Sequence, residues 1–123
     1  MSRPTLSVVM PNYNHARYLK RAIEGILEQT WPADEFLILD DASTDNSVEI
    51  IESYAARHTC IRLVKNQKNT GVIAAHKKLF EMASGDYLFS AAADDDRYPC
   101  FFEQAMEMAV KYPEAGLIFG KMV

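Results

Sequence analysis

Two kinds of hydrophobic pattern alternate along this chain. Runs of consecutive apolar, often β-branched residues are typical of strands buried in a sheet, and they occupy residues 5–10, 35–40, 60–65, 86–93 and 115–123. Between them, apolar residues recur every three or four positions, as on one face of a helix, within residues 17–29, 45–58, 72–83 and 99–112. Because parallel strands need helical crossovers, this alternation predicts an α/β fold. We expect a Rossmann-like, mostly parallel sheet with helices on both faces.

Local signals set the expected ends of the helices. Thr44 or Asp45 can cap the second helix, and Pro99 can open the fourth. Gly85 follows the third helix, where a C-terminal cap is expected. The residues of the third helix that should pack against the sheet are Val72, Ala75, Leu79, Phe80 and Ala83.

The composition indicates a single globular domain over residues 1–123. A formal net charge of −4 argues against a nucleic-acid-binding surface, which needs a basic face. Cys60 and Cys100 lie far apart and lack metal-ligand spacing, so we expect reduced thiols and a cytoplasmic protein. Pro11 cuts the first apolar run, and no run reaches the length of a membrane span. Since the chain ends on an apolar run, we expect it to be a fragment of a longer protein.

Polar residues follow each of the first four predicted strands. Ligands bind beyond the carboxyl ends of strands in an open parallel sheet, and the loops there read PNYNHAR, DDASTDNS, NQKNTG and ADDDRYP. Asp40 and Asp41 can also end a strand and begin a turn. The second cluster, Asp94, Asp95 and Asp96, can also be a solvated helix start. Because both clusters should converge on one crevice, we favour a Mg²⁺ or Mn²⁺ site that anchors a diphosphate.

Tyr13 and Asn14 follow the first strand and offer an aromatic face and an amide, which suit a nucleobase. The alternative for Tyr13 is that it packs under its own loop. His15, His58 and His76 show no metal-ligand pairing, and His76, on the helix after the third strand, is expected to point toward the crevice.

The chain resembles the family 2 glycosyltransferases, which have the GT-A fold. The resemblance rests first on SVVMPNYNHARYLKRAIEGILEQTWPADEFLILDDASTDNS. That family opens with an apolar strand, P-x-Y-N, a helix ending in Q-T and a strand ending in D-D-x-S-T-D. The later stretch NTGVIAAHKKLFEMASGDYLFSAAADDDRYP resembles its N-x-G, G-D-Y and acidic-proline segments. The resemblance covers essentially the whole chain and implies transfer of a sugar from a nucleoside-diphosphate sugar, most simply a UDP-sugar, to an acceptor hydroxyl with inversion. A saccharide or a lipid-linked molecule would be the acceptor.

The same resemblance implies a nucleotide pocket in the first half of the chain. Pro11, Tyr13 and Asn14 would line it, with Tyr13 against the base. Asp41 would accept a hydrogen bond from the base or ribose, and Asp40 would support it.

Further residues matched to the family would lie near the phosphates of the donor. Asn69 and Gly71 would shape the loop beside it. The family often has Ala-Arg-Asn where this chain has Ala75, His76 and Lys77, so His76 is the nearest candidate for a phosphate contact.

The metal site implied by the resemblance consists of Asp94, Asp95 and Asp96, which correspond to the D-x-D motif of the family. The family usually has its first acid where this chain has Ala92, so which carboxylate binds the ion stays open. The family's general base lies downstream of this motif, and we expect it beyond Val123. The chain is therefore expected to bind nucleotide and metal but to turn over poorly by itself.

Three rival readings remain. A dinucleotide-dependent oxidoreductase would need a glycine-rich turn after the first strand, and PNYNHAR has no glycine. A phospho-acceptor receiver domain would carry its acid pair after the first strand rather than the second. A glycosyltransferase-like binding module without activity is the third alternative, and Ala92 is the only sign of it.

Overall fold

The computed structural model describes residues 3–93, 99–114 and 116. Strands and helices alternate in the order expected from the sequence. They are β1 (Leu6–Asn12), α1 (Ala16–Leu27), β2 (Glu35–Asp40), α2 (Ser47–Arg57), β3 (Ile61–Lys65), α3 (Val72–Met82), β4 (Tyr87–Ser90) and α4 (Phe101–Lys111). The acidic run at 94–96 and the strand expected at 115–123, apart from residue 116, lie outside the described residues.

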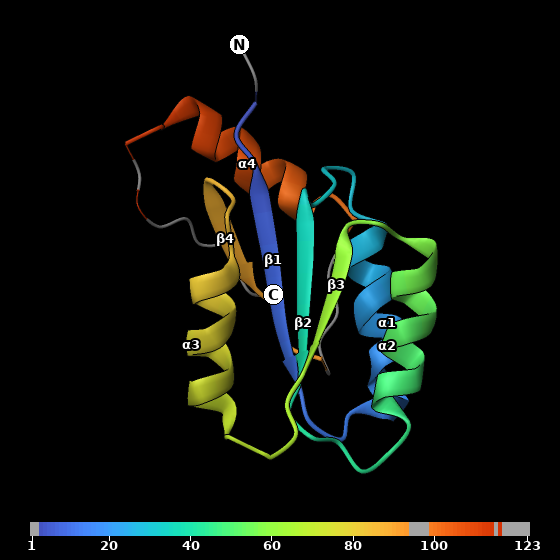
Figure 1. Ribbon diagram of the computed structural model, residues 1–123. Coiled ribbons are helices and arrows are strands. Elements are labelled where there is room, and N and C mark those ends of the chain that lie inside the picture. Colours follow the sequence, from blue (N-terminus) through green and yellow to red (C-terminus); the bar gives the residue numbers. More distant parts are fainter. Residues whose placement is uncertain (1–2, 94–98, 115, 117–123) are drawn as a thin grey trace.

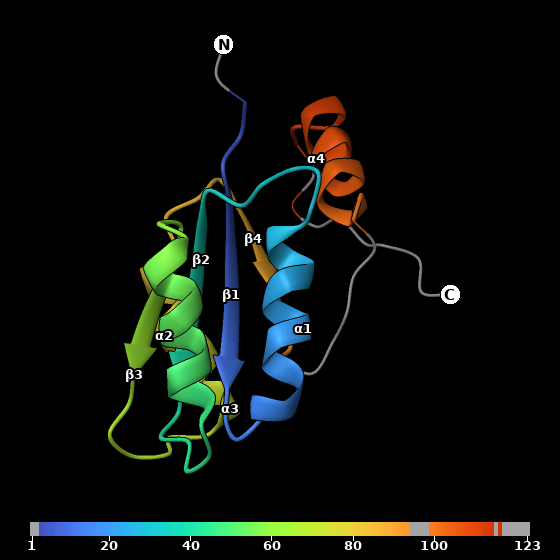
Figure 2. The ribbon, with the colours of Figure 1, turned by 90° about the vertical axis from the view of Figure 1, so that its right-hand side faces the viewer.

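The described strands form one parallel sheet in the order β3-β2-β1-β4. Helices α1 and α2 cover one face of this sheet and α3 covers the other, as Figure 1 shows. Figure 2 shows α4 beside the end of α1, where the backbone N–H of Phe102 donates to Oε1 of Gln29 at 2.8 Å. The predicted parallel sheet with helices on both faces is therefore confirmed.

Successive residues of β1 face two different cores, because side chains alternate across a strand. Val8 lies in the larger core, with residues of α1, α2 and α4. Val9 lies in the smaller core with Leu37, and α3 contributes Ala75 and Leu79 to it. Full burial of a side chain of this size stabilises the fold by about 1.5–3 kcal/mol. The sheet is thus fixed from both sides, and its carboxyl edge is left for the loops.

The predicted inner face of α3 is partly wrong. Ala75 and Leu79 are buried as expected, but Val72 is 62% exposed and Phe80 is 48% exposed. Phe80 lies about 100° round the helix from Leu79, and α3 rests on β1 and β2. Only a narrow stripe of α3 therefore reaches the sheet, and Phe80 projects to one side of it.

Gly85 does not cap α3, contrary to expectation. The cap is Ala83, whose N–H donates to the carbonyl of Leu79, and Gly85 instead lies against the start of β1. A Cβ atom added at Gly85 would lie 2.5 Å from Oγ of Ser7 and 2.8 Å from its backbone nitrogen. The glycine is needed because two segments of backbone approach each other closely here.

Candidate functional site at the carboxyl edge of the sheet

The loops after β1 and β2 are joined at the carboxyl edge of the sheet by a group of hydrogen bonds. The last residue of β1, Asn12, is paired in register with Asp40. Nδ2 of Asn12 donates to Oδ1 of Asp40 at 2.9 Å and to Oγ of Ser43 at 3.3 Å. Ser43 in turn donates from Oγ to Oδ1 of Asp40 at 2.7 Å and from its backbone nitrogen to Oδ2 at 3.0 Å. We call Asn12, Asp40 and Ser43 the latch.

Asp40 is the structural centre of the latch. Its side chain is only 1% exposed, and both of its oxygens accept hydrogen bonds from within the chain. The turn suggested as an alternative for this residue is therefore present, because the carboxylate accepts from the backbone N–H three residues later.

Asn14 extends the connection between the two loops. Its Oδ1 accepts from the backbone N–H groups of Thr44 at 2.8 Å and Asp45 at 3.3 Å. Its own backbone N–H donates to Oγ of Ser43 at 3.0 Å. Asn14 has a φ of 56°, in the left-handed region that asparagine tolerates better than most residues. The amide oxygen expected to meet a nucleobase is thus used to hold the second loop.

Tyr13 lies between Asn12 and Asn14 and is 44% exposed. The alternative in which it packs under its own loop is therefore wrong. Tyr13 is exposed beside the end of β1, while both neighbouring residues are tied to the next loop. Val9 is the last residue of β1 that pairs with β4, and Pro11 lies two residues beyond it. Because proline has no backbone N–H, its position there leaves the hydrogen bonds between β1 and β4 intact.

Asp41 binds the loop that follows β3. Its side chain is 4% exposed. Oδ1 accepts from Nδ2 of Asn66 and from the backbone N–H and hydroxyl of Thr70, each at 2.9 Å. Oδ2 accepts from the backbone N–H of Gly71 at 2.9 Å. Burial raises the pKa of Asp41, but these hydrogen bonds outweigh it, so that the pKa lies below its usual value.

Gly71 and Asn69 shape the start of α3. Gly71 has a φ of 90° and open space where a Cβ would stand, so backbone conformation rather than crowding requires glycine here. Oδ1 of Asn69 accepts from the backbone N–H of Gly71 at 3.1 Å. The expectation that both residues shape this loop agrees with their geometry, whereas their proximity to a donor stays a prediction.

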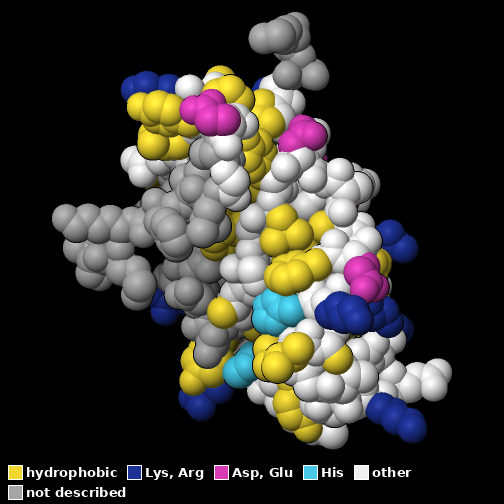
Figure 3. All heavy atoms as spheres, turned by 90° about the vertical axis from the view of Figure 1, so that its left-hand side faces the viewer, with side chains coloured by type: hydrophobic (Ala, Val, Ile, Leu, Met, Phe, Trp, Pro, Cys, Tyr) yellow, Lys and Arg dark blue, Asp and Glu magenta, His cyan; other side chains and the backbone are white. Residues whose placement is uncertain are grey.

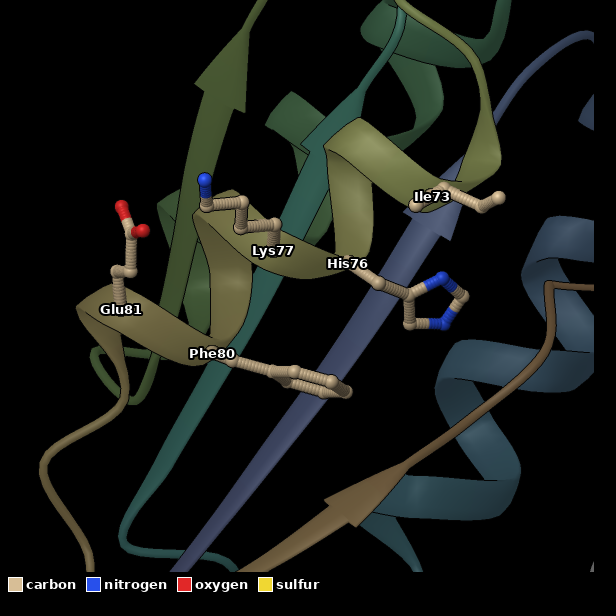
Figure 4. Close-up of a pocket in the computed structure, with 5 residues that line it drawn as sticks. All are labelled: Ile73, His76, Lys77, Phe80 and Glu81. Carbon is tan, nitrogen blue, oxygen red and sulfur yellow. The ribbon is translucent and has the colours of Figure 1, made fainter.

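His76 lies beside Ser90, the last residue of β4, and its expected contact with a phosphate stays a prediction. Its Nδ1 lies 2.9 Å from the carbonyl of Val72, and its Nε2 lies 3.1 Å from Oγ of Ser90 on β4. It lines a hollow of roughly 490 Å³ on α3 together with Ile73, Lys77, Phe80 and Glu81 (Figure 4). Figure 3 shows hydrophobic side chains gathered around histidine on this face, with lysine beside them. His76 is therefore not brought to the latch.

The metal residues expected from the sequence cannot be placed, since Asp94, Asp95 and Asp96 lie outside the described residues. Among the residues that the structure does describe, no group of three or more His, Cys, Asp or Glu side chains is placed to hold a metal ion. No described helix is long and apolar enough to cross a membrane.

Several residues of the site were missed by the sequence analysis. They are Asn12, Ser43, Asn66 and Thr70, each of which holds one loop against another. Asp45 was expected as a cap of the second helix and accepts from the backbone N–H of Ser47, but its second bond, to the N–H of Ala16 at the start of α1, was not foreseen. Their short polar side chains within turn-rich loops were the available signal.

A parallel sheet with helices on both faces and polar loops joined at its carboxyl edge defines an α/β protein of the class in which ligands bind at that edge. Residues 7–122 match the family described as glycosyl transferase family 2, and the chain belongs to this family. The resemblance inferred from the motifs is thereby confirmed.

Among known relatives, an uncharacterized glycosyltransferase of Escherichia coli K12, YibD, is 41% identical over 106 residues, which are 86% of this chain and 30% of YibD. A crystal structure of Staphylococcus aureus TarS in complex with UDP superposes with a TM-score of 0.81 at 21% identity, over 89% of this chain and 33% of that one. The structure of the mannosyltransferase PcManGT from Pyrobaculum calidifontis, in complex with GDP-Man and Mn²⁺, superposes with a TM-score of 0.77 at 27% identity, over 94% of this chain and 34% of that one. The chain spans about a third of the length of YibD and of each of the two chains in these structures.

Proposed function

We propose that this chain is the donor-binding part of a glycosyltransferase that moves a sugar from a nucleoside-diphosphate sugar to an acceptor hydroxyl with inversion. The observation that carries the proposal is the latch between the loops after β1 and β2, which presents Tyr13 at the carboxyl edge of the sheet. Membership of glycosyl transferase family 2 supports a nucleoside-diphosphate sugar as the class of ligand at this edge. The complexes of TarS with UDP and of PcManGT with GDP-Man and Mn²⁺ support the same class.

In this proposal the base of the nucleotide stacks on Tyr13. Stacking of a base on an aromatic side chain is worth about 1–3 kcal/mol, and the ring is open to solvent. Pro11 and Asn14 line the same pocket. Asp41, supported by Asp40, contacts the base or ribose. The hydrogen bonds that its carboxylate already accepts from Asn66, Thr70 and Gly71 would compete with those from the ligand.

The phosphates of the donor would lie farther along the edge. We propose that Asn69 and Gly71 border them, and that Asp94, Asp95 and Asp96 hold a Mg²⁺ or Mn²⁺ ion. Such an ion supplies positive charge for the diphosphate that departs. A general base is needed to deprotonate the acceptor, and we assign that role to none of these 123 residues. We therefore expect the chain to bind the donor but to transfer little sugar.

Thermal shift and calorimetry with UDP, GDP-mannose and NAD, each with and without Mn²⁺, test this proposal. We expect a nucleoside diphosphate to raise the unfolding temperature only when Mn²⁺ is present, because the acids would otherwise repel the phosphates. Asp94→Ala should remove the metal dependence, whereas Glu107→Ala, an exposed acid on α4, should not. Stabilisation by NAD without metal would contradict the proposal, and so would efficient sugar transfer by the 123-residue chain.

A further inference from the structure

The hydroxyl of Ser43 is the shared partner of three groups, two in the latch and one in the backbone of Asn14. It donates to Oδ1 of Asp40 at 2.7 Å and accepts from the backbone N–H of Asn14 at 3.0 Å and from Nδ2 of Asn12 at 3.3 Å. A serine hydroxyl has one donor hydrogen and two acceptor lone pairs. All three are used within the chain, so Ser43 has no capacity left for a ligand.

The two residues anchored on Ser43 are the neighbours of Tyr13 on either side. Asn12 ends β1, and its side chain is bound to Ser43 and Asp40. Asn14 has a φ of 56°, and its side-chain oxygen accepts a hydrogen bond from the backbone N–H of Thr44. With both neighbours fixed, the backbone of Tyr13 is held although the residue is 44% exposed.

We propose that Ser43 is a positioning residue, which holds the ring of Tyr13 at the edge of the sheet in readiness for the base of a nucleotide. The inference rests on the proposed function, since it needs a base to be bound. A loop ordered in advance avoids the entropy loss that ordering on binding would cost. Ser43 therefore acts on affinity through Tyr13 and without contact to the ligand.

Calorimetry of UDP binding in the presence of Mn²⁺ to the 123-residue protein and its Ser43→Ala variant tests this inference. We expect Ser43→Ala to weaken binding ~10-fold, the effect of about one lost hydrogen bond. Ser43→Thr keeps the hydroxyl and should bind nearly as wild type. Ser53→Ala is the matched control, because that hydroxyl only donates to the carbonyl of Ile50 within α2.

A double-mutant cycle with Tyr13→Leu distinguishes positioning from a general loss of structure. In the Tyr13→Leu background, Ser43→Ala should cause little further loss of UDP affinity. Equal losses in both backgrounds would overturn the inference, as would wild-type affinity of Ser43→Ala. If the wild-type protein binds UDP and Ser43→Ala binds it equally well, only this inference fails. If the wild-type protein binds no nucleoside diphosphate, the proposed function fails with it.

Hydrogen exchange of the wild-type protein keeps the inference testable if Ser43→Ala does not fold. The backbone N–H of Asn14 belongs to an exposed residue, and its hydrogen bond goes to Oγ of Ser43. We expect this amide to be protected from exchange. Exchange at the rate of a free amide would overturn the inference, because the latch would then not hold Tyr13.

Discussion

Asp41 illustrates how much of this site depends on single residues. Its buried carboxylate accepts hydrogen bonds from Asn66, Thr70 and Gly71, so that one side chain at the end of β2 holds the whole loop before α3. These donors favour the charged form and keep the pKa below its usual value despite burial. Charge and loop structure are therefore linked at this residue.

Asp41→Asn should destabilise the protein by about 1–3 kcal/mol near neutral pH, because an amide places donors where the loop also has donors. The pKa of Asp41 is lower in the folded than in the unfolded state, whose ordinary value is 3.8. Its contribution to stability is thus complete above that value and is lost as the pH falls through the folded pKa.

Urea denaturation of the wild type and of Asp41→Asn at a series of pH values measures this effect. The difference between the two free energies of unfolding should be constant above about pH 5 and should shrink toward about pH 2. A difference that stays constant over the whole range would contradict the assigned hydrogen bonds.

Asp45 connects two elements through one carboxylate. Its Oδ1 accepts from the backbone N–H of Ser47, the first residue of α2, at 2.9 Å. Its Oδ2 accepts from the backbone N–H of Ala16, the first residue of α1, at 3.1 Å. Asn46 immediately precedes α2, yet its side chain makes no capping bond. The starts of both helices are therefore held by Asp45.

Asp45→Ala should lower the free energy of unfolding by about 1–2 kcal/mol, as expected for loss of a helix cap. Asn46→Ala, next to it in the chain, should change stability by less than about 0.5 kcal/mol. Chemical denaturation of both variants, followed by circular dichroism, gives the comparison. A larger effect of Asn46→Ala than of Asp45→Ala would show that the cap is assigned to the wrong residue.

The periodic patterns predicted the elements better than they predicted the contacts between them. The alternation of strands and helices follows from local sequence, since buried strands and amphipathic helices have different hydrophobic periods. The exposure of Phe80 could not be predicted, because it depends on which strands α3 rests upon. Ser43 and Thr70 were missed for a similar reason, since their partners lie about 30 residues away in the chain.

At the scale of the whole molecule, the close approach of Gly85 and Ser7 joins β1 and β4, the first and the last of the described strands along the chain. The backbone N–H of Gly85 donates to Oγ of Ser7 at 2.7 Å, and β4 then pairs with β1 from Leu6 to Val9. The backbone N–H of Thr5 also donates to Oδ2 of Asp86 at 2.9 Å. The position of β4 therefore depends on this contact.

Gly85→Ala should cost about 1–3 kcal/mol of stability, because the added methyl group would overlap the backbone of β1 and force the segments apart. Gly116→Ala is the matched control, since a Cβ there meets no atom within 4 Å. Thermal unfolding of the two variants tests the difference. Equal stability of Gly85→Ala and the wild type would mean that the strands are not packed so closely.

The central place of β1 has a consequence for the order in which the chain is made on the ribosome. One edge of β1 receives β2, which follows within about 30 residues, whereas the other edge receives β4, whose residues pair with β1 across 81 positions, as Tyr87 does with Leu6. Until residue 90 has left the exit tunnel, that second edge of the nascent sheet has no native partner. An unpaired strand edge invites pairing with other chains, so the interval between the synthesis of β1 and that of β4 is a stage at which this part of the chain is exposed to aggregation.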